Sequence, residues 1–186
     1  MITKKYLEVI RSLKKGKDAQ LIDNARKILD GIKPAFLEKY FDGDLQKYSD
    51  AEMSLIRQIY PLVALMPNLK DKTVLDLGCG SASIEAKFSY LNHRMYEPWL
   101  CRALLEIGAK PIGVDINSND GEKFENYIAD FYKPNSLSFL RDNSVDIANA
   151  GAIFNLPGFD EDKLRKNLIP QLERIVKPEG FFVYQD

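Results

Sequence analysis

Three short apolar segments of this chain each end in an aspartate, and these are Asp76, Asp115 and Asp130. The first is followed at once by a Gly-x-Gly turn, Gly78 to Gly80. Glycines at the carboxyl end of a strand can adopt positive φ and let the backbone pass close to a ligand. Because the carboxyl ends of parallel strands meet at one edge of a sheet, we expect the three carboxylates to line a single crevice.

The three aspartates suit different parts of a ligand. Asp76 can fix a cationic or hydroxylated group, and Asp115 can accept hydrogen bonds from both hydroxyls of a ribose. Asp130 stands beside Phe131, and a carboxylate next to an aromatic ring suits an adenine. The alternative is that each aspartate only caps a turn or a helix. Three aspartates at successive strand ends favour the ligand.

The elements that must position these residues change in kind near residue 70. Before it, apolar residues recur at helical spacing, with Gly31 as a stop, Ser49–Glu52 as a capping box and Pro61 as a kink or break. After it, short apolar strands alternate with helices, which predicts an α/β three-layer sandwich with a mostly parallel sheet. We expect helices over 3–15, 18–31, 34–43, 49–66, 97–107 and 161–176, and strands over 72–77, 111–116, 126–129, 145–150 and 181–185. The chain is therefore divided into an N-terminal helical extension or lid (1–68) and a ligand-binding domain (69–186).

Composition excludes several classes of function. The two cysteines, Cys79 and Cys101, do not make a disulfide scaffold and indicate a reduced, cytoplasmic location. The single histidine, His93, leaves almost no material for a zinc site or a Ser/His/Asp triad, so no metal is expected. No stretch is long and apolar enough for a membrane span, and the first residues lack the apolar core of a signal peptide. A pI near 6.0 argues against a dedicated nucleic-acid binder.

A set of motifs between residues 72 and 186 resembles the class I S-adenosylmethionine-dependent methyltransferases, which have a Rossmann-like fold. The matching residues are the first loop motif Val74–Ser83, the ribose acid Asp115, the adenine-side pair Asp130–Phe131, the fourth strand Val145–Ala150, and the Lys-Pro-x-Gly turn within Leu172–Val183. The resemblance implies in-line methyl transfer from S-adenosylmethionine, and the near-neutral charge and the aromatic loop favour a small-molecule acceptor over nucleic acid. It further implies cofactor contacts from Asp76, Gly78, Cys79, Gly80, Ser81, Asp115, Ile116, Asp130, Phe131 and Asn149.

The chain departs from the family pattern in three places. Ala82 replaces the third glycine of the loop, and about fifteen extra residues precede the helix that begins near Pro98. The sequence ends at Asp186, just after the expected fifth strand, whereas the family normally adds a sixth strand and a seventh antiparallel one. We therefore expect a truncated chain, a minimal domain, or a sheet edge completed by another chain, such as a homo-oligomer formed through the exposed edge.

The inserted stretch 83–99 is rich in aromatic residues and leaves the sheet where the reacting group would lie. Long loops at a ligand edge are often lids or substrate walls. We expect this stretch to cover the transferred methyl group, with His93 or Tyr96 available as a base, and with Tyr96, Trp99 and the later Asn155 contacting the acceptor. The alternative is that its rings are a satellite of the core and that His93 is a solvated loop residue.

Two other functions stay open. A degenerate cofactor-binding domain that serves as a partner subunit would fit Ala82 and the missing strands. A nicotinamide-dependent oxidoreductase would fit the spacing Gly78-x-Gly80-x-x-Ser83. Against it, an acid stands directly before the loop, and Asp115 lies far beyond the ~20 residues expected for the ribose acid of such enzymes.

Overall fold

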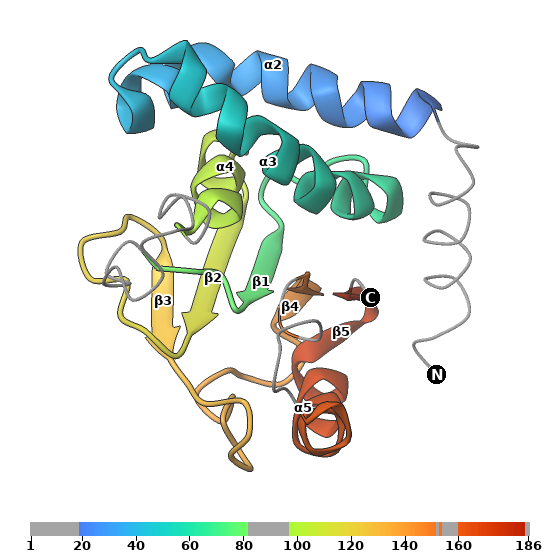
Figure 1. Cartoon of the computed structure of the whole chain (residues 1–186). Helices are drawn as coiled ribbons and strands as arrows, with labels where there is room; N and C mark the ends of the chain where they lie inside the picture. Colours follow the sequence, from blue (N-terminus) through green and yellow to red (C-terminus); the bar gives the residue numbers. More distant parts are fainter. Residues whose placement is uncertain (1–18, 82–96, 152, 154–159, 185–186) are drawn as a thin grey trace.

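The computed structural model describes residues 19–81, 97–151, 153 and 160–184. Its centre is a five-stranded parallel sheet in the order β3-β2-β1-β4-β5 (Figure 1). This confirms the predicted α/β fold, and β1 to β4 each lie within one residue of their predicted bounds. The strands are β1 Thr73–Leu77, β2 Lys110–Asp115, β3 Glu125–Ile128, β4 Val145–Ala150 and β5 Val176–Tyr184.

Helices cover both faces of the sheet because neighbouring strand residues point to opposite sides. Val74 and Ile147 pack with α2, α3 and α4 in one core cluster. Leu75 and Ala148, the next residues along, pack with α5 in a second cluster. Figure 1 shows α2 and α3 together beyond α4, with α5 on the other side of the sheet. The helices are α2 Ala19–Phe41, α3 Leu45–Leu65, α4 Trp99–Ile107 and α5 Glu161–Ile175.

The first described helix, α2, runs through the predicted stop. We expected one helix to end at Gly31 and another to begin after Pro34, but α2 contains both residues. This prediction was wrong because packing outweighs the local signals. Leu29 and Phe36, on either side of the expected break, are both buried in the same core cluster, so a continuous helix keeps both side chains in the core.

Helix α2 ends where the backbone turns left-handed. Asp42 and Gly43 have φ of 51° and 76°, and the Gly43 N–H donates to the carbonyl of Leu37 at 3.2 Å. This is the Schellman pattern, which satisfies carbonyls that the helix end leaves unpaired. The helix therefore ends close to residue 43, where we expected the helix over residues 34–43 to end.

Helix α3 begins at Leu45, before the predicted capping box at Ser49. The cap is Asp44, whose Oδ1 accepts the Gln46 N–H at 3.0 Å. Pro61 lies inside α3 and does not split it, so of the predicted kink or break the break does not occur. The residues next to this proline are buried in the core cluster, so tertiary packing holds the helix together across the missing N–H.

The two later helices agree with the prediction. Helix α4 follows Pro98 and ends at Gly108, which has φ of 85° and caps the helix through its N–H. Helix α5 is capped by Asp160, whose side chain accepts the Lys163 N–H at 3.0 Å. Helix α4 packs on one face of the sheet and helix α5 packs on the other.

Strand β5 begins earlier than predicted and contains a bulge. Residues 177–180 fall between regular pairs with β4, so the expected turn lies within the strand. A Cβ on Gly180 would lie 2.7 Å from the carbonyl oxygen of Asp146, so only glycine fits there. Asp146 Oδ1 pairs with Lys177 Nζ at 2.8 Å, and its Oδ2 accepts the Thr73 N–H at 2.9 Å.

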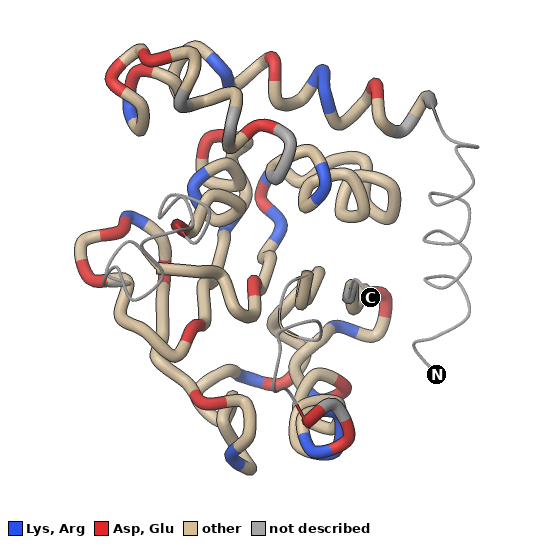
Figure 2. The backbone as a smooth tube through the Cα atoms, in the orientation of Figure 1, with Lys and Arg blue, Asp and Glu red and all other residues tan. Residues whose placement is uncertain are grey.

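The described N-terminal helices cover a face of the sheet and carry mixed charge. Basic and acidic residues are interspersed along α2 (Figure 2). No helix in the described ranges is long and apolar enough to cross a membrane. The prediction that residues 1–68 also act as a lid over the crevice stays a prediction.

Candidate functional site

The residues expected to line the crevice lie at the carboxyl ends of β1, β2 and β4. The chain leaves β1 for β2 on one side and later returns to β4 on the other, so the strand order reverses at β1. Ligands in open α/β sheets bind at such a reversal. Asp76 and Asn149 are register partners across β1 and β4, and Asp115 is the last residue of β2. The structure therefore brings these three predicted residues to one edge.

Asp76 is the most deeply buried acid of the site, with 4% of its surface exposed. Its Oδ1 accepts a hydrogen bond from Asn149 Nδ2 at 2.8 Å, and the Cys101 thiol donates to its Oδ2 at 3.7 Å. Burial raises the pKa of Asp76 to about 7, although both of these hydrogen bonds act in the opposite direction. The carboxyl is thus poised between its charged and neutral forms at neutral pH, and a nearby cation would favour the charged form.

The Gly-x-Gly loop has the positive-φ backbone that its glycines predict. Gly78 and Gly80 have φ of 68° and 85°. The N–H of Gly78 donates to the carbonyl of Val114 at 2.8 Å, which ties the loop to the end of β2. A Cβ on Gly78 would lie 2.2 Å from Ile153 Cγ2, so no other residue fits at this position.

Asp115 holds this loop in place. Its Oδ2 accepts the Gly80 N–H at 3.0 Å. Its Oδ1 accepts both the backbone N–H of Asn117 at 3.0 Å and the side-chain amide of Asn117 at 3.1 Å. A carboxylate offers about four lone-pair directions, so Asp115 can brace the loop and still accept a hydrogen bond from a ligand.

Sequence reasoning missed a second residue behind the loop, Asn119. Its Nδ2 donates to the carbonyl of Gly80 at 2.9 Å and contacts the Cys79 sulfur at 3.4 Å. The Oδ1 of Asn119 is buried and finds no hydrogen-bond donor in the described part of the chain, and the same is true of Asn149 Oδ1. In the sequence, Asn119 lies in an Asn-Ser-Asn-Asp-Gly run, which is typical of a turn and gave no separate signal.

The hydroxyl of Ser81 also ties the loop to this turn. Its Oγ donates to the carbonyl of Ser118, and the Ser81 side chain is buried. A predicted cofactor contact at Ser81 would therefore come from the backbone or from the remaining lone pairs of this hydroxyl.

The two cysteines pack beside the loop. A Cβ on Gly113 would lie 2.9 Å from the Cys79 sulfur and 3.3 Å from the Cys101 sulfur, so both thiols occupy the space that this glycine leaves. Both cysteines are buried and free. Burial raises the pKa of Cys101 well above its usual range, so its thiol stays protonated and can donate to Asp76.

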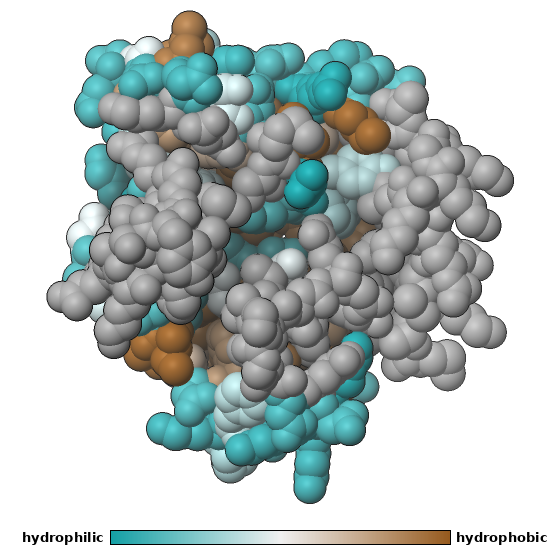
Figure 3. All heavy atoms as spheres, in the orientation of Figure 1, coloured by the Kyte–Doolittle hydropathy of each residue, from teal (hydrophilic) through white to brown (hydrophobic). Residues whose placement is uncertain are grey.

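The adenine-side pair is arranged differently from the prediction of a carboxylate beside an open ring. Asp130 Oδ1 accepts the Tyr132 N–H at 3.0 Å, which caps the turn after β3. Phe131 is buried in the core cluster beneath the sheet. The apolar surface at this end comes instead from Ile116 and Ile128, which are 66% and 63% exposed. Figure 3 shows an apolar patch near the end of β3.

The residues predicted to contact the acceptor are not brought together in the described structure. Trp99 is 2% exposed and stacks on Phe41 at 4.7 Å between ring centroids, within the helical layer. Its side chain therefore contributes to the core, as the alternative interpretation of the insertion proposed. His93, Tyr96 and Asn155 lie outside the described residues, and so does Ala82.

An ion-paired arginine joins the segments that border the crevice. Arg102 of α4 pairs with Glu97, where the chain returns from the insertion, and with Glu122 in the turn after β2. Its guanidinium lies over the rings of Trp99 and Tyr40 at 4.6 and 5.1 Å. Arg102 is 7% exposed, so this network is shielded from solvent. It couples helix α4 to the turn that contains Asn119.

Comparison with known proteins gives structural matches only. No family model matches the chain, and no curated protein matches it. A SAM-dependent methyltransferase from Archaeoglobus fulgidus is similar, with 23% identity, a TM-score of 0.44 and coverage of 75% of this chain and 57% of that one. The Burkholderia thailandensis 1,6-didemethyltoxoflavin-N1-methyltransferase is similar at 16% identity, with a TM-score of 0.43 and coverage of 86% and 63%.

A dehydrogenase is among the similar structures as well. A C-terminal deletion mutant of Thermoplasma acidophilum aldohexose dehydrogenase matches at 16% identity, with a TM-score of 0.38 and coverage of 64% of this chain and 51% of that one. The chain thus spans about half to two thirds of the length of these structures. Likeness at these identities concerns the fold alone.

Metal ligands are not gathered in the described part of the chain. No group of three or more His, Cys, Asp or Glu side chains there is placed to hold a metal ion. The site's chemistry in these ranges rests on carboxylate and amide oxygens, which accept hydrogen bonds from hydroxyl and ammonium groups, and on backbone N–H groups, which donate to hydroxyl oxygens.

Proposed function

We propose that this chain binds S-adenosylmethionine at the carboxyl ends of β1, β2 and β4 and transfers its methyl group to a small-molecule acceptor. The observation that supports this most is the bracing of one glycine loop between two strand-end acids. Asp76 precedes the loop, and Asp115 accepts the Gly80 N–H from the neighbouring strand. The order of motifs from residue 72 onward, which resembles the class I methyltransferases, supports the same proposal.

The donor and acceptor chemistry of the site suits this ligand. The acceptors at these strand ends are the carboxylates of Asp76 and Asp115 and the buried amide oxygen of Asn149, which lacks a donor within the described ranges. S-adenosylmethionine carries a ribose with two hydroxyls and an α-ammonium group, all of which are donors. A buried acceptor without a donor costs roughly 1–3 kcal/mol, so a ligand that supplies donors gains from these residues.

The residues of this site would then have defined roles. Asp115 would accept a hydrogen bond from a ribose hydroxyl while it holds the loop, and charged Asp76 would face the ammonium group. S-adenosylmethionine, when bound, supplies a methyl group on a sulfonium leaving group. The protein's contribution is orientation and exclusion of water, and orientation alone can supply roughly 7–11 kcal/mol. A base is needed only for an acceptor that is protonated at neutral pH; His93 and Tyr96 stay the predicted candidates.

Calorimetric titration with S-adenosylmethionine and S-adenosylhomocysteine tests the cofactor. Asp115→Asn removes the charge and one acceptor oxygen, and we expect it to weaken binding by about 10- to 100-fold, the value of a charged hydrogen bond. Asp71→Asn is the matched control, because Asp71 is exposed in the turn before β1 and has φ of 62°, which asparagine tolerates. Binding that is equal in both variants, or absent from the wild type, would overturn the proposal.

The same titrations separate the alternatives. NAD binding without binding of the sulfur ligands would favour the nicotinamide oxidoreductase. Binding of the sulfur ligands without methyl transfer to any compound of an acceptor library would favour the partner subunit. In that case light scattering should show association, which we expect through the outer edge of β5, the last strand of the described sheet.

A further inference from the structure

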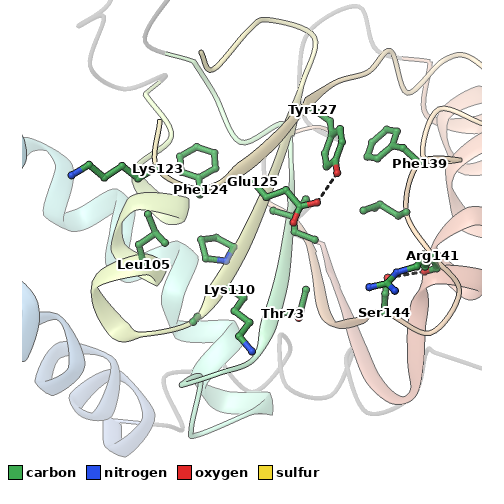
Figure 4. Close-up of a pocket in the computed structure, with 14 residues that line it drawn as sticks. Thr73, Leu105, Lys110, Lys123, Phe124, Glu125, Tyr127, Phe139, Arg141 and Ser144 are labelled. Carbon is green, nitrogen blue, oxygen red and sulfur yellow. Dashed lines mark hydrogen bonds between the residues drawn. The ribbon is translucent and has the colours of Figure 1, made fainter. Parts of the chain in front are cut away.

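A cavity lies at the edge of the sheet where the strands begin, opposite the proposed cofactor site. Its volume is about 560 Å³, and Thr73, Lys110 and Glu125, the first residues of β1, β2 and β3, contribute to its lining (Figure 4). The aspartates of the proposed cofactor site lie at the other ends of these strands. None of those site residues lines the cavity, so a ligand bound here would be separate from the cofactor.

Helix α4 borders this cavity through Leu105. The connection between β3 and β4, residues 129–144, runs as a series of turns. It covers the sheet there with Phe139 and Leu140, which line the cavity. Phe139 stacks on Tyr127 with ring centroids 4.1 Å apart and planes 24° apart, and it remains 37% exposed. The cavity thus has a wall of stacked rings that solvent and ligands can reach.

Three basic side chains line the same cavity. Lys110, Lys123 and Arg141 line it, and within the described ranges none of them has an ion-pair or side-chain hydrogen-bond partner. Glu125, the one acid among the described lining residues, accepts a hydrogen bond from the hydroxyl of Tyr127 at 2.6 Å. Figure 4 shows the cations on different sides of the cavity, with the two rings along another side. The rim is therefore net positive around a partly apolar interior.

We propose that this cavity binds a small anion that carries a planar ring, of the aryl phosphate or aryl carboxylate class. The ring would stack against Phe139 and Tyr127, and the anionic group would be held by the lysine and arginine side chains of the rim. A cavity of about 560 Å³ falls within the range of small-molecule sites, roughly 300–1,000 Å³. This inference does not depend on the proposed methyl transfer.

Titration of the full chain with phenyl phosphate tests the proposal. We expect saturable binding that weakens as ionic strength rises, because exposed charges are screened by salt. Inorganic phosphate, which lacks the ring, should bind more weakly, and benzyl alcohol, which lacks the charge, should bind more weakly as well. The same arms repeated with benzoate show whether the site distinguishes a phosphate from a carboxylate.

Variants locate the ligand. Lys110→Gln and Arg141→Gln should each weaken the binding of phenyl phosphate by about two- to fivefold, as for exposed ion pairs. Phe139→Ala should weaken it by roughly three- to tenfold through the lost ring contact. Lys27→Gln is the matched control, because Lys27 is an exposed lysine of α2 far along the chain from the cavity. All four side chains are exposed, so the variants should fold.

Three results would overturn the proposal. The first is the absence of saturable binding of phenyl phosphate at millimolar concentration. The second is equal affinity in the wild type and in the double variant Lys110→Gln, Arg141→Gln. The third is displacement of phenyl phosphate by S-adenosylhomocysteine, which would place the ligand in the crevice. Failure of S-adenosylmethionine to bind would leave each of these measurements unchanged.

Discussion

Burial of Asp76 should make the stability of this protein decrease as the pH rises through the neutral range. The pKa of Asp76 rises from 3.8 to about 7 on folding, chiefly because the carboxyl is taken out of water. Between these two values the folded chain holds a proton that the unfolded chain has released. The stabilisation is therefore complete below about pH 4 and is lost as the pH rises through about 7.

The magnitude follows from the shift itself. Each tenfold change in proton affinity is worth about 1.4 kcal/mol, so the charged form of Asp76 costs the folded state about 4 kcal/mol. Asp76 is 4% exposed, so solvent screens little of this cost. Asp76→Asn keeps a neutral side chain at every pH, and its amide oxygen can still accept the hydrogen bond from Asn149. The variant should therefore lose the pH dependence of the unfolding free energy that the Asp76 carboxyl introduces.

Urea unfolding of the wild type and of Asp76→Asn measures this directly. The difference in unfolding free energy between the two should move by about 3 kcal/mol in favour of the variant between about pH 4.5 and about pH 8. All other titrating groups are common to both proteins and cancel in the difference. The unfolding free energy of Asp71→Asn, a change at an exposed position, should depend on pH in the same way as that of the wild type. If the unfolding free energy of Asp76→Asn also depends on pH as that of the wild type does, burial does not raise the pKa of Asp76 as argued.

Three further predictions concern the loop, its neighbours and the ligand. Gly78→Ala should lower the unfolding free energy by at least about 2 kcal/mol, because it adds a Cβ at positive φ against Ile153. Gly31→Ala is the control: a Cβ there meets nothing within 4 Å, so the variant should raise the unfolding free energy by roughly 0.5–1 kcal/mol. Similar urea unfolding curves for the two variants would contradict this prediction. Arg102→Met leaves two shielded carboxylates without their cation and should cost about 3 kcal/mol in the same assay, whereas an unchanged midpoint would mean that the network contributes no net stability. If S-adenosylmethionine is the ligand, its affinity by calorimetry should rise between pH 6 and 8 as Asp76 becomes charged, and the rise should be absent from Asp76→Asn; a flat wild-type profile would separate Asp76 from the ammonium group.

The strands could be predicted closely because buried parallel strands are continuous apolar runs with a sharp end. Asp76 and Asp115 mark such ends, and the structure places both at the crevice. The helices were harder, because Gly31 and Pro61 are strong local signals that a packed core overrides. Leu29 and Leu62, both buried in the same cluster, lie close to those positions. No local pattern reveals that the layer around them is tight enough to keep the helices continuous.

The site could be predicted in its acids and less well in its other side chains. An acid at a strand end has few places to go, whereas a ring can turn either into the core or toward a ligand. Phe131 and Trp99 were both expected at the crevice, and both are buried in core clusters. Asn119 acts through contacts with Gly80 and Cys79, which lie 39 and 40 positions away from it in the chain. No local spacing in the sequence can show such contacts.

The bulge in β5 has a consequence for how the sheet is aligned. Because Phe182 and Val183 face opposite layers, a slip of one residue against β4 would exchange the contents of the two layers. A slip would also carry Gly180 away from the one position where the carbonyl of Asp146 leaves no room for a side chain. Lys177 would lose the carboxylate that also anchors the start of β1. The Lys-Pro-Glu-Gly segment therefore fixes the register of β5 against β4 and is linked through Asp146 to the start of β1, so it aligns three strands from the end of the sheet opposite the proposed cofactor site.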